Sequence, residues 1–413
     1  MRIVALIYDD LANPWLGGGG ARRTYEVARR LAMRHAVTVV AGGYPGAGSE
    51  RLRDGVRYLF TAPQAGYAAS RLAYIRHAPL LARKLASDLT IEVFSAYNPL
   101  FTPLWAKRPQ LAILHNIYRG HAVAKHGLIG RLAALLERPA LVGFRNYLAV
   151  SHGLADELAR TVRLRGKRLA VIANGIDATF FAHPHTSGRP DYALSLGRID
   201  IYQKGLDTLL AALHRTNLSP PLPKRGSGEQ TPSPISGEGG GGGEYIRLLI
   251  AGGGPDEQVS RVRDLIAGYG LGDAVEMLGR VSQEQAANLL LDTACRFVVM
   301  PSRHEAFGMV AAEAGAAGKA VLAFDISGLR EAAPASAHGL LMTPSPISGE
   351  GWGGGSEEQR VATLSEGLIR LWCDPQQAAR QGERGRTWAR RYTWDAVAEA
   401  EERYYLSLAG VDG

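Results

Sequence analysis

The sequence predicts an α/β protein built from two doubly wound domains. Short apolar runs typical of buried parallel strands alternate with helical patterns along nearly the whole chain. This alternation pauses once, at residues 174–190, where an Asn-Gly pair leads into a segment containing Pro, His and Gly. A length of 413 residues is enough for two domains, each with its own core. We therefore expect an N-terminal domain over residues 1–180 and a C-terminal domain over residues 181–393.

The first half of the chain opens on a strand. Residues 3–8 form an apolar run, and a loop containing four successive glycines then leads to a helix over about residues 22–34. A further helix is expected at 153–161. The remaining strands of this half are expected at 37–41, 56–60, 90–95, 111–114, 147–150 and 169–172.

The second half repeats the same theme. Its strands are expected at 192–196, 246–250, 275–278, 297–300 and 320–324. Its helices are expected at 206–214, 259–269, 283–292 and 361–373, and the tail over 376–408 is helical except near 392–394. A second series of strands and helices predicts a second sheet of the same kind.

Two low-complexity segments do not fit this alternation. Residues 231–243 read TPSPISGEGGGGG and residues 343–355 read TPSPISGEGWGGG, so that they differ at one position. Segments of Pro, Ser and Gly have little apolar surface to bury. We interpret 219–243 and 343–355 as loop insertions at the surface.

Composition restricts the class of protein. Hydrophobic residues make up 46% and charged residues 21% of the chain, and no apolar run approaches the roughly 20 residues of a membrane span. The apolar start is too short for a signal peptide and is followed at once by acids. Cys295 and Cys373 are the only cysteines, too few for a disulfide framework or a typical zinc site. These features favour a cytoplasmic protein.

Charge is distributed unevenly between the halves. Residues 1–185 hold 25 Lys and Arg against 11 Asp and Glu, a balance of +14, whereas the remainder has a balance of −6. Within the basic half, residues 70–85 and 122–145 mix Arg and Lys with Leu and Ile. We expect this half to bind an anionic partner. The candidates are the inner face of the membrane, a lipid-linked acceptor and an acidic glycan. Pro79 and Pro139 interrupt both patterns, so buried helices with basic outer faces are the alternative. Nothing indicates a nucleic acid.

Residues 301–313 carry the strongest motif. They follow an apolar strand and read PSRHEAFGMVAAE, with Glu305 before and Glu313 within a predicted helix. A helix start offers unpaired N–H groups and a partial positive charge, which suit a phosphate. Eight helical residues rise about 12 Å, comparable to the span from a hexose to the ribose of a sugar nucleotide. The alternative is an ordinary strand–loop–helix with solvated acids.

A pair of cations lies at another helix start. Arg198 and Lys204 follow a strand in SLGRIDIYQKG, and such a pair is suited to binding a diphosphate without a metal. The alternative is a basic loop neutralised by Asp200 or Asp207. No Asp-x-Asp motif of metal-dependent sugar transfer occurs in the chain.

Residues of the first half could complete a ligand site. The glycine loop that includes Gly19 and Gly20 opens the first helix and lets a ligand approach the backbone closely. His115 follows a strand, where open α/β sheets bind ligands. The dinucleotide fingerprint G-x-G-x-x-G is absent. A flexible surface loop and a structural histidine are the alternatives.

Taken together, these residues resemble a family 4 retaining glycosyltransferase of the GT-B fold. The resemblance extends over nearly the whole chain. It rests on the glycine loop, Ser151-His152-Gly153, the run AlaAsnGlyIleAsp at 173–177, the pair Arg198 and Lys204, the E-x7-E motif from Glu305 to Glu313, and the tail with Arg386 and Trp394. Ala173, where proline is common, and the two insertions depart from the family pattern.

The resemblance implies a fold and a reaction. Two Rossmann-like domains would face a central cleft, and the C-terminal helix at about 394–408 would cross back onto the first. The enzyme would move a sugar from a UDP- or GDP-sugar to a glycan or lipid-linked acceptor with retention, in polysaccharide or glycolipid synthesis. It would need no metal or other cofactor.

The resemblance also assigns residue roles. Arg198 and Lys204 would bind the donor diphosphate, and Glu305 would face the donor sugar as the catalytic residue. Glu313 would take the ribose hydroxyls. The remaining positions would be backbone groups of Phe307, Gly308 and Met309 on phosphate, and Gly19, Gly20 and His115 on the N-terminal side.

Two other functions fit the same motifs. The protein could be a GT-B-fold epimerase of sugar nucleotides, or a module that binds sugar nucleotides without catalysis. Intact cations and acids at 198, 204, 305 and 313 speak against the second. Product analysis without an added acceptor distinguishes the first.

Overall fold

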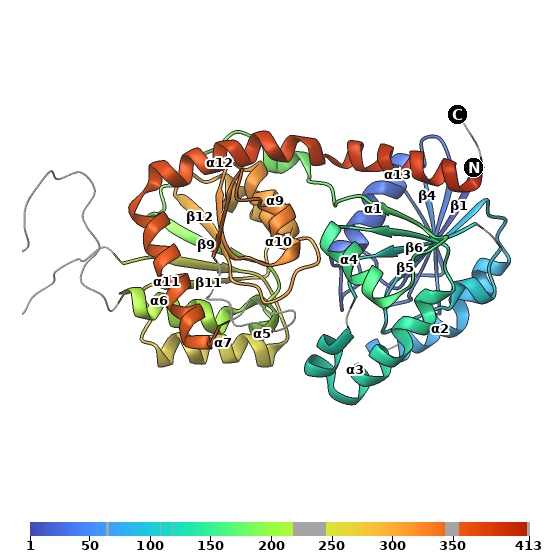
Figure 1. Ribbon diagram of the computed structural model, residues 1–413, viewed down its shortest axis with the longest axis horizontal. Coiled ribbons are helices and arrows are strands. Elements are labelled where there is room, and N and C mark those ends of the chain that lie inside the picture. Colours follow the sequence, from blue (N-terminus) through green and yellow to red (C-terminus); the bar gives the residue numbers. More distant parts are fainter. Residues whose placement is uncertain (63–65, 108, 118, 218–244, 343–354, 411–413) are drawn as a thin grey trace, which may run out of the picture. The chain divides into compact units, whose positions relative to one another are not determined.

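The computed structural model describes residues 1–62, 66–107, 109–117, 119–217, 245–342 and 355–410 (Figure 1). Contacts divide the chain into two compact units, one formed by Met1–Gly175 with Tyr392–Gly413 and the other by Ile176–Arg391. The division falls five residues before the boundary expected after residue 180. Apart from Gly355, the two low-complexity repeats lie outside the described residues.

The first unit contains an eight-stranded sheet in the order β3-β4-β2-β1-β5-β6-β7-β8. Every neighbouring pair is parallel except β3 and β4, which are antiparallel. All five residues of β6 are buried, as expected when helices cover both faces of a parallel sheet. The strands are β1 (Arg2–Ile7), β2 (Ala36–Ala41), β3 (Glu50–Arg53), β4 (Val56–Phe60), β5 (Leu89–Phe94), β6 (Gln110–Leu114), β7 (Asn146–Ala149) and β8 (Arg168–Val171).

Helices from both ends of the chain cover this sheet. The C-terminal helix α13 packs against α1, and the two lie side by side in the structure (Figure 1). The segments interrupted by Pro79 and Pro139 are helices that run through these prolines. The helices are α1 (Gly19–Leu31), α2 (Tyr67–Arg83), η1 (Thr102–Leu104), α3 (Arg119–Val142), α4 (His152–Thr161) and α13 (Trp394–Ala409).

The second unit contains a six-stranded, wholly parallel sheet in the order β11-β10-β9-β12-β13-β14. The four central strands are buried almost throughout, and their side chains join an apolar core of this unit. The strands are β9 (Tyr192–Leu196), β10 (Leu248–Ala251), β11 (Val275–Gly279), β12 (Cys295–Met300), β13 (Ala320–Phe324) and β14 (Gly339–Met342).

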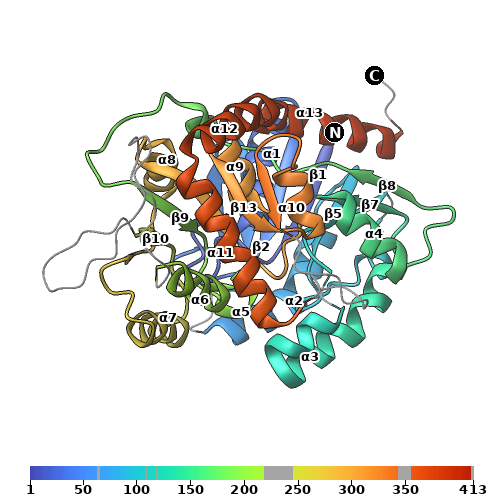
Figure 2. The same ribbon diagram turned by 60° about the vertical axis from the view of Figure 1, so that its left-hand side comes forward.

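Two layers of helices cover the second sheet. Helices α6, α7 and α11 lie together over one face (Figure 2), and α8, α9 and α12 contact the strands from the other. The helices are η2 (Ala178–Phe181), α5 (Ile201–Lys204), α6 (Leu206–Asn217), α7 (Asp256–Gly268), α8 (Gln283–Leu291), α9 (Met309–Ala316), α10 (Ser327–Ala332), α11 (Glu357–Cys373), α12 (Pro375–Ala389) and η3 (Arg390–Tyr392).

The expected pair of doubly wound sheets is confirmed. The strands expected at 56–60, 192–196 and 320–324 have the bounds that the structure gives to β4, β9 and β13. The prediction omitted β3 and β14, which are four-residue strands at the outer edges of their sheets. Short edge strands are packed on fewer sides, so their apolar pattern is weak. No helix among the described residues could span a bilayer.

Candidate functional site

The main candidate site lies in the second unit, where β9 and β12 end. The first contribution comes from the short helix α5. Asp200 caps its start by accepting a hydrogen bond from Gln203 N at 3.0 Å, and Gly205 ends it with a left-handed backbone (φ +66°). A Cβ on Gly205 would lie 2.1 Å from the carbonyl oxygen of Pro301. Only glycine therefore allows the turn after α5 to lie against the loop after β12.

This close approach brings Lys204 to Glu305. The Lys204 ammonium donates a hydrogen bond to Glu305 Oε1, and Ser302 Oγ donates to the same oxygen at 2.9 Å. The backbone N–H of Arg303 also donates to Gln203 O at 2.9 Å. The side chains of Lys204 and Glu305 are 20% and 12% exposed, so both are held but still reached by solvent. The pair is a charge-assisted contact between the last residue of α5 and the loop after β12, 101 residues apart in the chain.

Arg198 is held more loosely. Its guanidinium donates to Gln203 Oε1 at 3.2 Å and lies 3.8 Å from an Asp200 carboxylate oxygen, and its side chain is 54% exposed. Asp200 already acts as the cap of α5. The structure thus pairs Lys204 with Glu305 and leaves Arg198 open at the same sheet edge.

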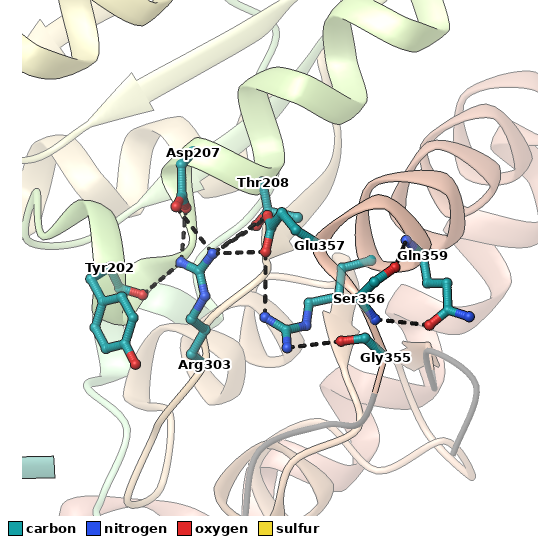
Figure 3. Close-up of polar contacts among 9 residues, drawn as sticks. Tyr202, Asp207, Thr208, Arg303, Gly355, Ser356, Glu357 and Gln359 are labelled. Carbon is teal, nitrogen blue, oxygen red and sulfur yellow. Dashed lines mark hydrogen bonds and ion pairs between the residues drawn. The ribbon is translucent and has the colours of Figure 1, made fainter. Parts of the chain in front are cut away.

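Arg303 holds the loop after β12 in place through contacts with two helices (Figure 3). Its guanidinium, 8% exposed, donates to both Asp207 carboxylate oxygens at 2.8 and 3.0 Å. It also donates to Thr208 Oγ1 at 3.0 Å and to Glu357 at the start of α11. One side chain therefore ties the loop after β12 to α6 and α11. Asp207 pairs with Arg303, so it does not neutralise Lys204.

The loop then turns into α9 at Gly308. This residue has a left-handed backbone (φ +86°), and a Cβ there would lie 2.6 Å from Leu329. Phe307 is buried and anchors the turn, and Met309 begins the helix. The sequence estimate of a 12 Å helical span from Glu305 to Glu313 is wrong, because only residues 309–313 of it are helical. Four helical steps rise about 6 Å, and a loop forms the rest.

His338 positions α9 from below. Its ring is fully buried, with Nε2 3.0 Å from Ala311 O in the first turn of α9. A Cβ on Gly315 would lie 2.6 Å from Nε2 of this ring, and one on Gly385 would lie 2.7 Å from its Cγ, so both glycines make room for it. Burial lowers the pKa of His338 to about 4, and the imidazole is neutral at pH 7.

Glycines also line the neighbouring strand ends. A Cβ on Gly252, directly after β10, would lie 1.7 Å from Gly197 O, and one on Gly254 would lie 2.4 Å from Ile199 O. The backbone of the loop after β10 therefore runs against the loop that carries Arg198. Such contact leaves backbone groups at the sheet edge where α/β proteins bind ligands.

The glycine loop of the first unit is organised by Asp9. Its carboxylate accepts hydrogen bonds from the N–H groups of Gly17 and Gly18, both at 3.0 Å, and of Asp10 at 2.9 Å. Burial raises the pKa of Asp9 to about 6 even though these hydrogen bonds oppose the shift. The loop is thereby a fixed turn.

His115 lies beside the start of α1. A Cβ on Gly20, in the first turn of α1, would be 3.5 Å from His115 Cδ2. Burial, followed by repulsion from Arg23, lowers the pKa of His115 to about 3. Its buried Nε2 makes no hydrogen bond within the described part of the chain. The structure brings Gly20 and His115 together, with Gly19 at the start of α1.

A buried ion pair fastens the last segment of the first unit. Arg23 on α1 forms an ion pair with Glu401 on α13 at 2.6 Å and donates to Asn174 Oδ1 at 2.8 Å. A Cβ on Gly175 would lie 2.4 Å from the ring of Trp394. The Asn-Gly pair and the tryptophan of the tail are therefore packing partners.

Comparison with known families decides the class. A family model described as Glycosyltransferase Family 4 matches residues 17–180, and one described as Glycosyl transferases group 1 matches residues 177–348. The chain belongs to the family 4, or group 1, glycosyltransferases. The two matches meet close to the division between the two units.

Individual relatives of this glycosyltransferase are distant. The phosphatidylinositol N-acetylglucosaminyltransferase gpi3 subunit of Schizosaccharomyces pombe is 24% identical over 344 residues, which are 77% of this chain and 65% of that protein. The chain thus spans slightly less than two thirds of that relative's length.

Solved structures show the GT-B fold. Sucrose-phosphate synthase from Thermosynechococcus elongatus superimposes with a TM-score of 0.76 at 18% identity, covering 100% of both chains. Anabaena HepE, solved with UDP and glucose, gives a TM-score of 0.69 at 18% identity and covers 99% of this chain and 100% of its own.

The residues predicted for this glycosyltransferase fall into one group in each unit. Gly19, Gly20 and His115 gather in the first unit. In the second unit, Lys204 and Glu305 are in contact, and Arg198 lies in the loop between β9 and the short helix α5 that ends at Lys204. Phe307, Gly308, Met309 and Glu313 follow on the turn and helix after Glu305.

Several residues of the two candidate groups were missed by the sequence interpretation. Ser302 and Arg303 adjoin Glu305 but resemble any loop residues in sequence. Asp9 was part of a loop without an assigned role. The run Gly252-Gly253-Gly254 directly after a strand was a usable signal, because successive glycines at a strand end mark close backbone approach.

Proposed function

We propose that the protein is a retaining glycosyltransferase that moves a hexosyl group from a nucleoside diphosphate sugar to a glycan or lipid-linked acceptor. The observation that carries the proposal is the contact of Lys204 with Glu305 beside the exposed Arg198. A donor of this kind has a diphosphate next to a polyhydroxyl sugar. Cations suit the first part and a carboxylate suits the second.

In this proposal the cations stabilise the leaving group. The bond between the anomeric carbon and the diphosphate oxygen breaks, and negative charge grows on that oxygen. Arg198 and Lys204 neutralise it, together with N–H groups of Phe307, Gly308 and Met309 at the start of α9. Charge stabilisation by fixed donors is most effective where they are positioned in advance, and Arg303 and Gly205 hold α5, which ends at Lys204, in that way.

The acceptor hydroxyl then attacks the anomeric carbon on the same face from which the diphosphate departs. A new bond forms between the anomeric carbon and the acceptor oxygen, and the hydroxyl proton passes to the departing diphosphate oxygen. The anomeric configuration is retained, and the products are the glycoside and a nucleoside diphosphate. Glu305 faces the donor sugar and stabilises the positive charge that develops on its ring, while Glu313 accepts hydrogen bonds from the ribose.

Lys204 and Glu305 also compensate each other's charge before the donor binds. In the structure Lys204 compensates the Glu305 carboxylate, so neither charge is isolated at the sheet edge. Arrival of a diphosphate supplies a second anion for the ammonium. This frees the carboxylate to accept hydroxyl hydrogen bonds from the sugar.

Uridine is the base we favour for the donor. HepE of Anabaena, with the same fold over nearly the whole chain, was solved with UDP and glucose. We further propose that the reaction needs no metal, since Arg198 and Lys204 supply positive charge where a divalent cation would otherwise act. Full activity in excess chelator is the expected result. A requirement for added Mg²⁺ or Mn²⁺ would contradict this part.

Binding and transfer are tested separately. Purified protein is screened against UDP- and GDP-sugars by thermal shift, and the best donor is then tested with a panel of glycan and lipid-linked acceptors. Lys204→Ala should weaken donor binding roughly 10- to 150-fold, the value of a hydrogen bond to a charged group. Glu305→Gln, which keeps the shape of the side chain, should lower the transfer rate roughly 100-fold or more with a much smaller effect on binding.

Glu366→Gln is the matched control. Glu366 is an exposed acid of α11 outside the loops that carry the site, so this variant should bind and transfer like the wild type. Normal turnover by both Lys204→Ala and Glu305→Gln would refute the proposed site. Formation of the opposite anomer, followed by nuclear magnetic resonance, would refute retention. Conversion of the donor to an isomer without acceptor would identify an epimerase.

A further inference from the structure

A surface of the first unit combines exposed leucines with arginines. It consists of the exposed side chains of α2, η1 and the described C-terminal part of α3, and we call it the basic apolar surface. Exposure of several large apolar side chains on neighbouring elements is unusual for a face that only meets water. The members are Leu72, Arg76, Leu80, Arg83, Leu104, Arg131, Leu132, Leu135, Arg138 and Val142.

Helix α2 contributes an alternating stripe. Leu72, Arg76, Leu80 and Arg83 are spaced by three or four residues, so they lie on one side of the helix. Leu72 is 61% exposed and Leu80 is 53% exposed. The opposite side, which includes Tyr74, is buried against the sheet. The leucines are therefore not required by the core of this unit.

Helix α3 contributes a second stripe of the same kind. Arg131, Leu135, Arg138 and Val142 are again spaced by three or four residues, with Leu132 beside them. Leu132, Leu135 and Val142 are 58%, 72% and 48% exposed.

The short helix η1 connects the two stripes. Trp105, directly after it, lies under the Arg83 guanidinium at 5.7 Å from the ring centre. Pro103 within η1 lies close to Gly143, which follows the end of α3. A Cβ on Gly143 would lie 2.9 Å from the proline ring. Leu104, between these two contacts, is 82% exposed. The ends of α2 and α3 are thus joined through η1 into one surface, and both helices lie on the same side of this unit in two views (Figures 1 and 2).

The three elements themselves carry no exposed acid among their described residues. Glu137 is the only Asp or Glu in the sequences of α2, η1 and α3, and it is 2% exposed. A second copy of the same surface would be repelled, because it would place arginine against arginine. An anionic partner that also accepts leucine side chains is required.

From this combination we infer that the basic apolar surface docks on an anionic phospholipid bilayer. Leucines enter the boundary between headgroups and acyl chains, and the long arginine side chains reach back to the phosphates. Single leucines separated by cations are suited to a fluid lipid bilayer, because each leucine can insert independently between headgroups. A folded protein partner would instead call for a contiguous apolar centre with polar groups around it. Docking requires no sugar transfer, so it stands or falls separately from the proposed reaction.

Vesicle sedimentation tests the docking. The full chain is incubated with vesicles of phosphatidylcholine alone and with vesicles that contain about 30% phosphatidylglycerol, at about 0.05 M and about 0.5 M salt. Binding is expected only with phosphatidylglycerol and mainly at the lower salt. Arg76→Gln with Arg138→Gln should weaken it roughly 25-fold, since each cation near an anionic surface is worth about a fivefold change in partitioning.

Matched variants separate this surface from general charge. Arg261→Gln with Arg263→Gln removes the same charge from exposed positions of α7 in the second unit and should reduce vesicle binding much less. Leu80→Ser with Leu135→Ser should weaken binding without changing net charge. Leu52→Ser, at a leucine of β3 that is more exposed than either of these, is its control and should have little effect.

Three results would overturn the inference. The first is equal sedimentation with and without phosphatidylglycerol, and the second is equal loss of binding in the α7 control. The third is binding to a soluble polyanion such as heparin without any binding to anionic vesicles, which would assign the surface to an acidic glycan. Circular dichroism of each variant establishes that it is folded before it is compared.

Discussion

Replacement of Arg23 by methionine tests whether the buried ion pair holds the C-terminal helix in the first unit. The side chains of Arg23 and Glu401 are 2% and 1% exposed. The Arg23 guanidinium donates to Glu401, to Asn174 and to the carbonyl oxygens of Ile172 and Ala173, at 2.8–2.9 Å for the hydrogen bonds. Arg23→Met fills a similar volume but removes every one of these donors.

The expected loss is large because one charge remains. Glu401 keeps the hydrogen bond from the Tyr405 hydroxyl but loses its positive partner in a site closed to water. Removing one member of a buried ion pair lowers the free energy of unfolding by about 3–5 kcal/mol. For a unit of about 200 residues, this corresponds to a fall in the melting temperature of roughly 6–20 °C.

Thermal and urea unfolding, followed by circular dichroism, measure the loss. Arg34→Met is the control, because Arg34 pairs with the neighbouring Glu402 but is 64% exposed, and an exposed pair contributes about 1 kcal/mol or less. The double variant Arg23→Met with Glu401→Leu should recover part of the loss, since it leaves no unpaired charge. A decrease below about 1 kcal/mol for Arg23→Met would refute the reasoning. So would a double variant less stable than both single ones.

Two further predictions concern the second unit. Gly205→Ala should lower its stability by about 2–4 kcal/mol and weaken donor binding, because the new methyl group meets Pro301 O in a left-handed turn. Gly166→Ala, at φ +74° with open space around it, should cost about 1 kcal/mol, and equal effects of the two in urea unfolding would contradict the steric argument. For His338, the pKa is about 4 in the folded protein and about 6.5 in the unfolded chain, so the unfolded chain takes up the proton first as pH falls. Its contribution to stability is therefore complete above about pH 6.5 and decreases by about 3 kcal/mol toward pH 4. His338→Gln, which can still donate to Ala311 O, should lack this part of the pH dependence in urea unfolding, and an unchanged slope would exclude His338 as its source.

The central strands and the motif loops could be predicted from sequence, whereas the edges of the sheets could not. A strand such as Ala320–Phe324 is buried on both faces, so every residue in it is apolar and the run stands out. Glu50–Arg53 is paired on one side only and half exposed, so its charged residues give no such pattern. The more fully a strand is buried, the more clearly its sequence predicts it.

The candidate site residues could also be predicted from sequence, but the contacts that they make could not. Arg198, Lys204, Glu305 and the glycine before Met309 were recognised as types of residue at strand ends. Their sequence positions did not indicate that Lys204 would contact Glu305 instead of Asp207. Lys204 pairs with Glu305 because Asp207 already accepts hydrogen bonds from the Arg303 guanidinium.

The sequence by itself therefore determined the class of fold, the strand ends where chemistry is concentrated and the excess of positive charge in the first half. These properties depend on local composition and on periodicity, which neighbouring residues along the chain specify. Only the tertiary structure decided the partner of each charged group, the burial of Arg23 with Glu401 and the joining of α2, η1 and α3 into one basic apolar surface. The physical reason is that these contacts join residues far apart in the chain, and their strength depends on distance and on exclusion of water, which only packing determines.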